Sequence, residues 1–351
     1  METLRLTVET GNPESAASRQ AIARGAEILR AGGTVAFPTE TVYGLGANAL
    51  DAKAVRKIFV AKERPGWDPL IVHIGERAML RRVVAEVPEA AQRLMDAFWP
   101  GPLTLLLPRG AEVPALVTAG LEKVGVRMPA HPVTRALLQA AGVPVAAPSA
   151  NRFGRISPTT AGHVAEDLDG RIDAILDGGE TTFGVESTVV DVGEDQCGIY
   201  RPGAVTLEQI AAVSGVAVIF RTKPGREEGS AAAPAPGMGE RHYAPRARLV
   251  LVEGNGTAQV EALAAVMRRC EEAGERAGVM LPDEFEAALI GRRAEVFRWG
   301  SWGNAGELAH RLYAGLRALD AGEATVIVCP LPEPAGIGLA IRDRLTRAAA
   351  G

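Results

Sequence analysis

The stretch STVVDVGEDQCGIYR, Ser187 to Arg201, determines the type of sheet that this sequence predicts. It contains two apolar segments, 187–192 and 198–201, with only a short polar segment between them. A connection this short can join antiparallel strands, whereas parallel strands need a crossover of about a dozen residues or more. The stretch therefore predicts at least one antiparallel pair of strands.

Earlier apolar runs are separated by longer segments. They lie at 34–37, 70–74, 103–107, 124–128, 143–147 and 173–176. Apolar residues recur at helical spacing between several of these runs, for example at 88–98 and 132–141. Residues 38–49, PTETVYGLGANA, predict a long loop rich in turns. The combination predicts an α/β fold with a mixed parallel and antiparallel sheet.

After Pro245 the pattern becomes more regular. Apolar runs at 248–252, 278–281, 294–299 and 325–328 alternate with helical segments, which predicts a smaller Rossmann-like domain with a parallel sheet. Between the two patterns lies SAAAPAPGMGERHYAP, residues 230–245, whose Ala, Pro and Gly content is typical of a linker. We therefore expect a first domain over 1–220, a linker over 221–246 and a C-terminal domain over 247–351.

Composition excludes several classes of protein. A hydrophobic share of 47% with 23% charged residues is typical of folded chains, and a net charge of -4 argues against non-specific coating of nucleic acid. Cys197, Cys270 and Cys329 form no CxxC pair, which favours a reducing compartment and neither a zinc site nor a disulfide framework. No GxxxxGK[ST] motif appears, so a P-loop NTPase is excluded. The polar N-terminus and the absence of a membrane-spanning apolar run predict a cytoplasmic location.

Two cations end a predicted helix in AKERPGWDPLIVH, where Lys62 and Arg64 precede the helix-breaking Pro65. Cations at this position stabilise a helix by interacting with its dipole. They would equally serve as a phosphate clamp, with a point charge from Lys and a planar fork from Arg. The residues themselves leave both interpretations open.

Polar residues follow the strand at 143–147 in PSANRFGRISPT. Sheets of α/β proteins bind ligands at the carboxyl ends of their strands, so Ser149, Asn151 and Ser157 are candidate ligand contacts. The same residue types also form ordinary turns.

Arg127 lies within the apolar run VGVRM. A buried charge is costly unless it is paired, so Arg127 pairs inside the protein or binds a carboxylate ligand. Ser187 and Arg201, at strand ends, are weaker candidates. His73 in the apolar run LIVHI is more typical of a core residue than of a catalyst.

Taken together, several segments resemble one known family. FPTETVYGLG, AKERPGWDPLIVHI, VGVRMPAHP, APSAN, ESTVV and RPG, in this order over about 25–203, resemble the YrdC-type domain of L-threonylcarbamoyladenylate synthases. PGMGERHYAP, LYAGLRALD and GIGLAIRDRLTRAA resemble the remainder of the long, two-domain form. The resemblance implies a YrdC-like twisted sheet with helices around a concave cavity, followed by the smaller domain.

The resemblance also implies an activity. Such a nucleotidyltransferase joins L-threonine, bicarbonate and ATP into threonylcarbamoyl-AMP and releases pyrophosphate, with Mg2+ carried by the ATP phosphates and no metal ligands from the protein. A downstream transferase complex then modifies the adenosine next to the anticodon in tRNAs that read codons beginning with A. The tRNA is thus an indirect partner, and no membrane is involved.

The resemblance assigns residues to this chemistry. Lys62 and Arg64 are the expected catalytic residues. The expected ATP contacts are Arg64, Asp68, Lys123, Ser149, Asn151, Ser157, Arg201 and Tyr243. The expected L-threonine contacts are Thr41, His73, Arg127, Ala147 and Ser187. Two positions depart from the family pattern, because Asp68 replaces a usual Asn and Lys123 a usual Thr, so their roles in the site are open.

The linker and the activity each leave alternatives. GMGERHYAP, residues 237–245, is expected to fold back as a lid with Tyr243 on the ATP side, and a plain spacer is the alternative. For the whole protein, the alternatives are a non-catalytic RNA-binding module and a carbamoyl-transfer enzyme. The negative net charge argues against the RNA-binding module, and the lack of a Cys-rich segment argues against the carbamoyl-transfer enzyme.

Overall fold

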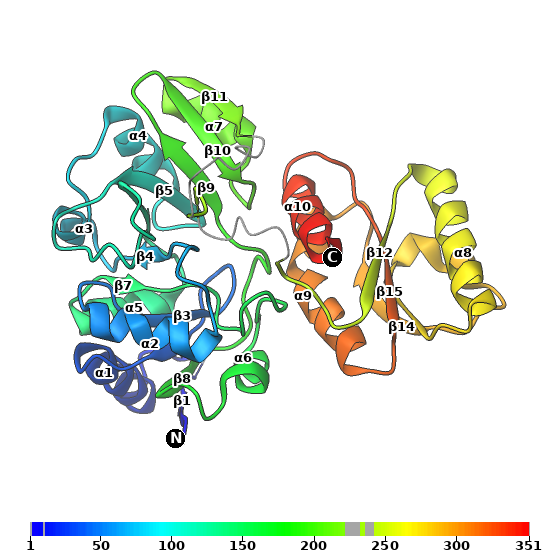
Figure 1. Ribbon diagram of the computed structural model, residues 1–351, viewed down its shortest axis with the longest axis horizontal. Helices are drawn as coiled ribbons and strands as arrows, with labels where there is room; N and C mark the ends of the chain where they lie inside the picture. The colour runs from blue at the N-terminus through cyan, green and yellow to red at the C-terminus, as the bar shows by residue number, and fades with distance from the viewer. Residues whose placement is uncertain (1, 10, 222–231, 236–241, 351) are drawn as a thin grey trace. The chain divides into compact units, whose positions relative to one another are not determined.

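The chain divides into two compact units in a computed structural model, which describes residues 2–9, 11–221, 232–235 and 242–350 (Figure 1). Unit 1 comprises Met1–Phe153, Ser157–Thr182 and Glu186–Gly239, and unit 2 comprises Gly154–Ile156, Phe183–Val185 and Glu240–Gly351. Unit 2 thus takes two short segments from the first part of the chain. The boundaries predicted at 220/221 and 246/247 stay predictions.

Unit 1 is built on one sheet of eleven strands. In spatial order these are β1 (Leu4–Thr7), β8 (Ala174–Asp177), β2 (Val35–Phe37), β3 (Gly44–Asn48), β7 (Val145–Ala146), β4 (Ile71–His73), β6 (Lys123–Arg127), β5 (Leu103–Pro108), β9 (Thr188–Val192), β10 (Gln196–Arg201) and β11 (Ala217–Phe220). β9 and β10 pair antiparallel, whereas β4 pairs parallel with β6. The predicted mixed sheet is confirmed.

The loop predicted over 38–49 is partly wrong, because β3 forms within it. β3 pairs antiparallel with both β2 and β7, so it is an interior strand. Its glycines permit this position: a Cβ on Gly46 would lie 2.5 Å from the Phe37 ring and 2.7 Å from Val145. The glycines in this segment therefore allow neighbouring strands to pack closely, and they do not indicate a loop.

Helices surround this sheet. They are α1 (Ala16–Arg30), α2 (Ala52–Lys62), α3 (Leu80–Val83), α4 (Glu89–Phe98), α5 (Pro132–Ala141), α6 (Ala161–Leu168) and α7 (Leu207–Ser214), with a 3-10 turn η1 (Arg77–Met79). Asp51 caps α2 by accepting a hydrogen bond from the Lys53 amide, as its residue type favours. Glu63 ends α2 in the left-handed conformation at φ 55°, immediately before Arg64. α2 and its cap thereby position Lys62 and Arg64.

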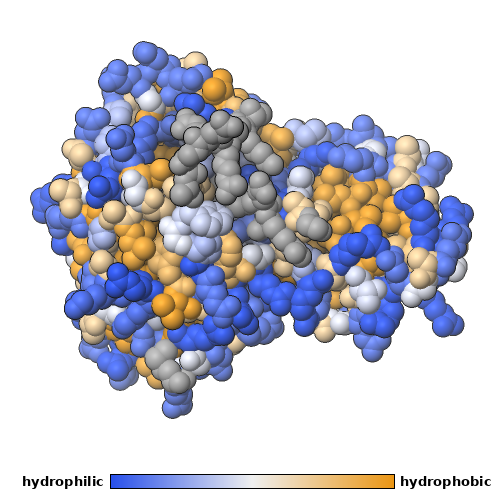
Figure 2. Space-filling model, in the orientation of Figure 1, coloured by the Kyte–Doolittle hydropathy of each residue, from blue (hydrophilic) through white to orange (hydrophobic). Residues whose placement is uncertain are grey.

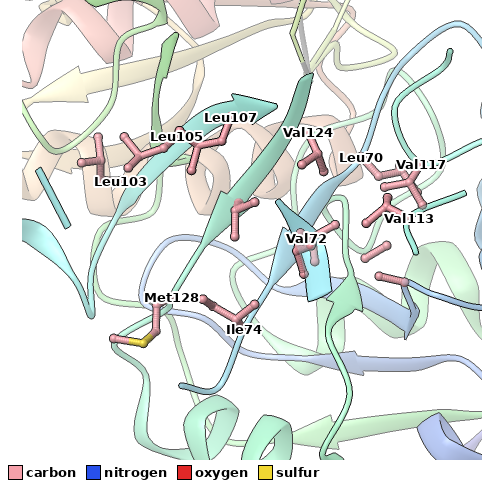
Figure 3. Packing of buried hydrophobic residues seen from close by; sticks show 14 of the residues in the cluster. Leu70, Val72, Ile74, Leu103, Leu105, Leu107, Val113, Val117, Val124 and Met128 are labelled. Carbon is pink, nitrogen blue, oxygen red and sulfur yellow. The ribbon is translucent and has the colours of Figure 1, made fainter. Parts of the chain in front are cut away.

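The largest apolar cluster of unit 1 covers one face of the central strands, and a second cluster that includes Phe37 and Val145 packs on the other face at β2 and β7. Leu103, Leu105 and Leu107 of β5 alternate along the strand and are fully buried, and Val72 and Val124 join them in the same cluster (Figure 3). Burial of each such side chain contributes about 1.5–3 kcal/mol. Because successive side chains of a strand point to opposite faces, the residues between them lie on the other face of the sheet.

Unit 2 carries a separate parallel sheet of four strands. Their order is β12 (Arg248–Val252), β15 (Val326–Pro330), β13 (Ala277–Pro282) and β14 (Glu295–Gly300). The connecting helices are α8 (Gly256–Glu272), α9 (Ala305–Ala321) and α10 (Gly338–Ala349), with the 3-10 segment η2 (Asp283–Leu289). All three strand pairs are parallel, which confirms the predicted Rossmann-like arrangement.

Polar residues cover much of the face shown in Figure 2, with apolar patches between them. Among the described helices, none combines the length and the apolar character needed to cross a bilayer.

Candidate active site

The face of the sheet opposite the apolar core carries the candidate site. On β4 and β6 the alternation that buries Val72 and Val126 in the core places His73 and Arg127 on this other face. The two residues are neighbours across the sheet, because β4 and β6 are parallel and His73 pairs in register with Arg127. Thr104 of β5 lies between two core leucines and belongs to the same face. Because side chains alternate along each strand, core residues lie on one face of these strands and candidate site residues on the other.

Arg127 is 3% exposed and held by three groups. Its Nε donates to the Gly101 carbonyl at 3.1 Å, and its Nη1 donates to Thr41 Oγ1 at 2.8 Å. Its Nη2 forms an ion pair with Glu40 Oε1 at 2.6 Å. Burial raises the pKa of Glu40, but the charge and close polar contact of Arg127, together with backbone amides, outweigh it, and the net shift is downward. Arg127 therefore has a carboxylate partner inside the protein.

His73 is neutral in this setting. Burial and the positive charge of Arg127 lower the pKa of His73 to about 3. Its ring meets Phe37 edge-to-face, with 6.3 Å between ring centroids. A neutral imidazole at this position can donate or accept a hydrogen bond but carries no charge.

Ser187 and Arg201 lie together where β9 begins and β10 ends. Arg201 donates from Nε to the Ser187 carbonyl and from Nη2 to Ser187 Oγ, both at 3.1 Å. The Ser187 hydroxyl is also 2.8 Å from Thr104 Oγ1. Two of the weaker sequence candidates thus form one buried polar group with a residue of the site face.

Gly203 fixes the position of Ser187. A Cβ on Gly203 would lie 2.3 Å from the Thr188 amide nitrogen and 2.6 Å from the Ser187 carbonyl carbon. Gly203→Ala is therefore expected to destabilise the protein by about 1–3 kcal/mol, because backbone must move to admit the methyl group. Urea unfolding measures this change. Gly11→Ala is the matched control, since a Cβ there meets nothing within 4 Å. Equal stability of the two variants would contradict the assignment.

Lys62 anchors the loop that follows β7. Its side chain is 1% exposed, and its Nζ donates to the carbonyls of Ser149, at 2.6 Å, and Asn151. Burial, together with the nearby charge of Arg64, holds the pKa of Lys62 well below its ordinary value. Asn151 Nδ2 donates to the Arg152 carbonyl at 2.8 Å. Lys62, Ser149 and Asn151 thus belong to one cluster.

Arg64 and Asp68 form a buried pair beside this cluster. Arg64 Nη2 lies 2.9 Å from Asp68 Oδ2, and Arg64 also donates to the carbonyls of Asp68 at 3.1 Å and Pro69 at 2.8 Å. The guanidinium carbon lies 5.8 Å from the Phe153 ring centroid. Asp68, the departure from the family pattern, therefore holds Arg64 in place in this structure.

Four other candidates lie apart from these contacts. Ser157 Oγ donates to Glu186 Oε1 at 2.6 Å, and the Ala147 amide donates to the Ile71 carbonyl of β4 at 2.9 Å. Lys123 forms an ion pair with Asp191 and lies about 13 Å along β6 from Arg127. Tyr243 belongs to unit 2, where it is 1% exposed, has φ 64° and stacks on Tyr313 at 5.7 Å.

The described part of the linker packs on unit 1. Ala235 is 1% exposed and joins Leu106 and Val189 in a small apolar cluster, and the Ala233 amide donates to the Trp67 carbonyl at 2.9 Å. Leu106 and Val189 lie on the site face, because they alternate with core residues of β5 and β9. Within the expected lid, residues 237–241 lie outside the described part of the chain.

Sequence reasoning missed the acids that pair with its candidates. Glu40 pairs with Arg127, Glu186 with Ser157 and Asp191 with Lys123. Glu40 had a signal, since it lies within the quoted FPTETVYGLG and is an acid among apolar and turn residues. Glu186 and Asp191 carried no comparable signal, because surface acids are common beside strands.

Comparison with known proteins identifies the family. A model for the Sua5/YciO/YrdC family, described as telomere recombination, matches residues 27–203, and one described as threonylcarbamoyl-AMP synthase, C-terminal domain, matches 205–350. The chain is 45% identical over 323 residues to the threonylcarbamoyl-AMP synthase of Pyrococcus abyssi, covering 92% of each chain. This chain belongs to the threonylcarbamoyl-AMP synthase family. The predicted resemblance to its two-domain form is confirmed, and the protein is an enzyme.

Two further relatives of the synthase family cover nearly the whole chain. The threonylcarbamoyl-AMP synthase of Bacillus subtilis is 43% identical over 359 residues, covering 100% of this chain and 99% of its own. The crystal structure of P. abyssi Sua5 complexed with L-threonine superposes with a TM-score of 0.89 at 41% identity, covering 99% of this chain and 98% of that one. The likeness supports the two-part α/β fold described above.

Proposed function

We propose that this synthase makes threonylcarbamoyl-AMP and pyrophosphate from L-threonine, bicarbonate and ATP, as a nucleotidyltransferase. The observation that carries the proposal is the pair of buried polar clusters in unit 1, one that holds Arg127 with Glu40 and one that holds Lys62 and Arg64 with Asp68. The reaction brings two anionic reactants together, so it needs fixed cations more than a strong base. Membership in the family and the L-threonine complex of the P. abyssi relative support this assignment.

The Arg127 cluster is proposed as the threonine subsite. Arg127 donates two of its five N–H groups to Gly101 and Thr41 and faces Glu40 through Nη2, which leaves donors for a carboxylate. Thr41, Ser187 and the neutral His73 would supply hydrogen-bonding groups for the amine and the hydroxyl, and the backbone at Ala147 is a further expected contact. A ligand lacking the threonine hydroxyl would then leave a buried polar partner unmatched, at a cost of about 1–3 kcal/mol.

The Lys62 cluster is proposed as the ATP subsite. Arg64 with Asp68, the loop at Ser149 and Asn151, and Arg201 would contact the phosphates and ribose, with Ser157, Lys123 and Tyr243 as further expected contacts. In the described ranges no group of three or more His, Cys, Asp or Glu side chains is placed to hold a metal ion. Mg2+ is therefore proposed to arrive bound to the ATP phosphates, whose charge it would partly neutralise.

The chemistry follows from this placement. The threonine amine, once deprotonated, attacks the carbon of CO2 and gives a carbamate as its nitrogen loses a proton to solvent; with bicarbonate as the acceptor, the same product forms with loss of water. A carbamate oxygen then attacks the α-phosphorus of ATP, the bond to the bridging oxygen breaks, and pyrophosphate leaves. Both intermediates are labile in water, which favours a buried site. We further propose that a transferase complex passes the threonylcarbamoyl group to the adenosine next to the anticodon of ANN-decoding tRNAs, with tRNA an indirect partner.

Release of pyrophosphate from ATP tests the proposal. Release is expected only when L-threonine and bicarbonate are both present, because the nucleophile that attacks the α-phosphorus contains both. Omission of either, in degassed buffer for bicarbonate, is expected to reduce the rate to background. Release that is indifferent to threonine would overturn the proposed function and would favour another use of ATP by the same fold.

A further inference from the structure

The carboxylate of Glu40 has more hydrogen-bond acceptor sites than its ion pair with Arg127 uses. The two side chains are buried, and Nη2 and Oε1 lie 2.6 Å apart. Their contact is an ion pair without an aligned hydrogen bond in the described part of the chain. An ionised carboxylate has about four acceptor sites on its two oxygens. Glu40 can therefore accept hydrogen bonds from a second cation while it faces Arg127.

A free amino acid brings two charges into this buried cluster. Each of them must meet an opposite charge, since an unpaired buried ion costs several kcal/mol. Arg127 matches the carboxylate, and the ammonium needs an acid beside it. The two imidazoles whose pKa the charge of Glu40 affects do not compete as cations, because burial lowers the pKa of both His73 and His131.

We propose that Glu40 binds the ammonium group of L-threonine, so that Glu40 and Arg127 together select a zwitterion. The inference rests on the proposed function, which assigns the threonine carboxylate to Arg127. In the bound state four charges alternate: guanidinium, substrate carboxylate, substrate ammonium and Glu40 carboxylate. Without substrate, Glu40 and Arg127 neutralise each other, as this structure shows. Glu40 is thus a specificity-determining residue.

Calorimetric binding of two ligands tests the inference. One is L-threonine, and the other is its hydroxy-acid analogue, 2,3-dihydroxybutyrate, in which a hydroxyl replaces the ammonium. Wild type is expected to bind L-threonine about tenfold to 100-fold more tightly, because hydrogen bonds to a charged group contribute about 1.5–3 kcal/mol. In Glu40→Gln we expect L-threonine to weaken by a similar factor and the analogue to bind as well as in wild type or better.

A structural role for Glu40 would give a different pattern. If Glu40 only positioned Arg127, Glu40→Gln would weaken both ligands in proportion, and that result would overturn the inference. Unchanged L-threonine affinity in this variant would also overturn it. Asp173→Asn is the matched control, because Asp173 is an acid of unit 1 that holds Thr34 at 2.7 and 2.9 Å. It is expected to leave both affinities unchanged.

A second variant removes the other member of the pair, Arg127. Arg127→Met removes the guanidinium that faces Glu40, so threoninol, a cation without the carboxylate that can take its place, is expected to bind at least about tenfold more tightly than to wild type. Unchanged or weaker threoninol binding would overturn the inference even if Glu40→Gln does not fold. Failure of the wild type to bind L-threonine is a separate outcome, which would overturn the proposed function.

Discussion

Arg127→Met is expected to raise the L-threonine concentration needed for half-maximal pyrophosphate release by about 100-fold, with little change in the ATP requirement. Removing one partner of a buried, charge-paired contact costs about 3 kcal/mol, and each 1.4 kcal/mol is tenfold in an equilibrium constant. Arg127 contacts Thr41 and Glu40 of the threonine cluster, and none of its three contacts is with the Lys62 cluster. The effect should therefore fall on one substrate. Steady-state rates at varied threonine and varied ATP measure it.

The variant also leaves Glu40 buried without its partner, which by itself destabilises the fold. Arg127→Met with Glu40→Gln removes that charge, so the double variant is expected to recover thermal stability without recovering threonine use. Arg30→Met, at an exposed arginine on α1, is the matched control and should behave as wild type. A parallel rise in both substrate requirements would show that Arg127 acts on the fold and not on the amino acid.

Lys62→Met is expected to lower turnover by about 100-fold or more at saturating substrates. Loss of one pre-positioned donor to developing charge typically costs about 10²–10³ in kcat. Here the same side chain also anchors the loop after β7 through the carbonyls of Ser149 and Asn151, so loop position would be lost as well. Single-turnover formation of threonylcarbamoyl-AMP measures the chemical step.

Lys57→Met is the matched control for this prediction. Lys57 is an exposed lysine on the same helix, five residues before Lys62, so it tests for a general effect of removing charge from α2. Near wild-type turnover is expected for it. Near wild-type turnover in Lys62→Met as well would leave Lys62 with structural roles only, at the helix end and in the loop after β7.

Local patterns were enough to predict the architecture. The short connection between 187–192 and 198–201 predicted the antiparallel pair that became β9 and β10. Pro65 predicted the end of α2, and the structure ends it at Glu63. Both features are determined by residues that are close together in the sequence, so a short segment is enough to predict them. The regular alternation after Pro245 predicted the parallel sheet of unit 2 for the same reason.

Pairings between distant residues could not be predicted in this way. β1 lies beside β8, which is about 170 residues away in sequence, and the register Leu4↔Ala174 has no local signature. Glu40 and Arg127 are likewise remote in sequence and meet only because the loop after β2 lies beside β6. The strand at 44–48 was missed because glycine signals turns and close packing alike. The assignments of site residues to ATP and threonine stay predictions.

Along β4 and β6, side chains that point to the core alternate with side chains that point to the candidate site. This alternation limits which changes of sequence the fold tolerates. Val126 lies in the core and Arg127, the next residue, lies in the site. Deleting one residue from β6 would turn the guanidinium into the hydrocarbon layer and a valine toward the substrate. Frame-preserving insertions and deletions in these strands therefore eliminate the fold before they can alter specificity.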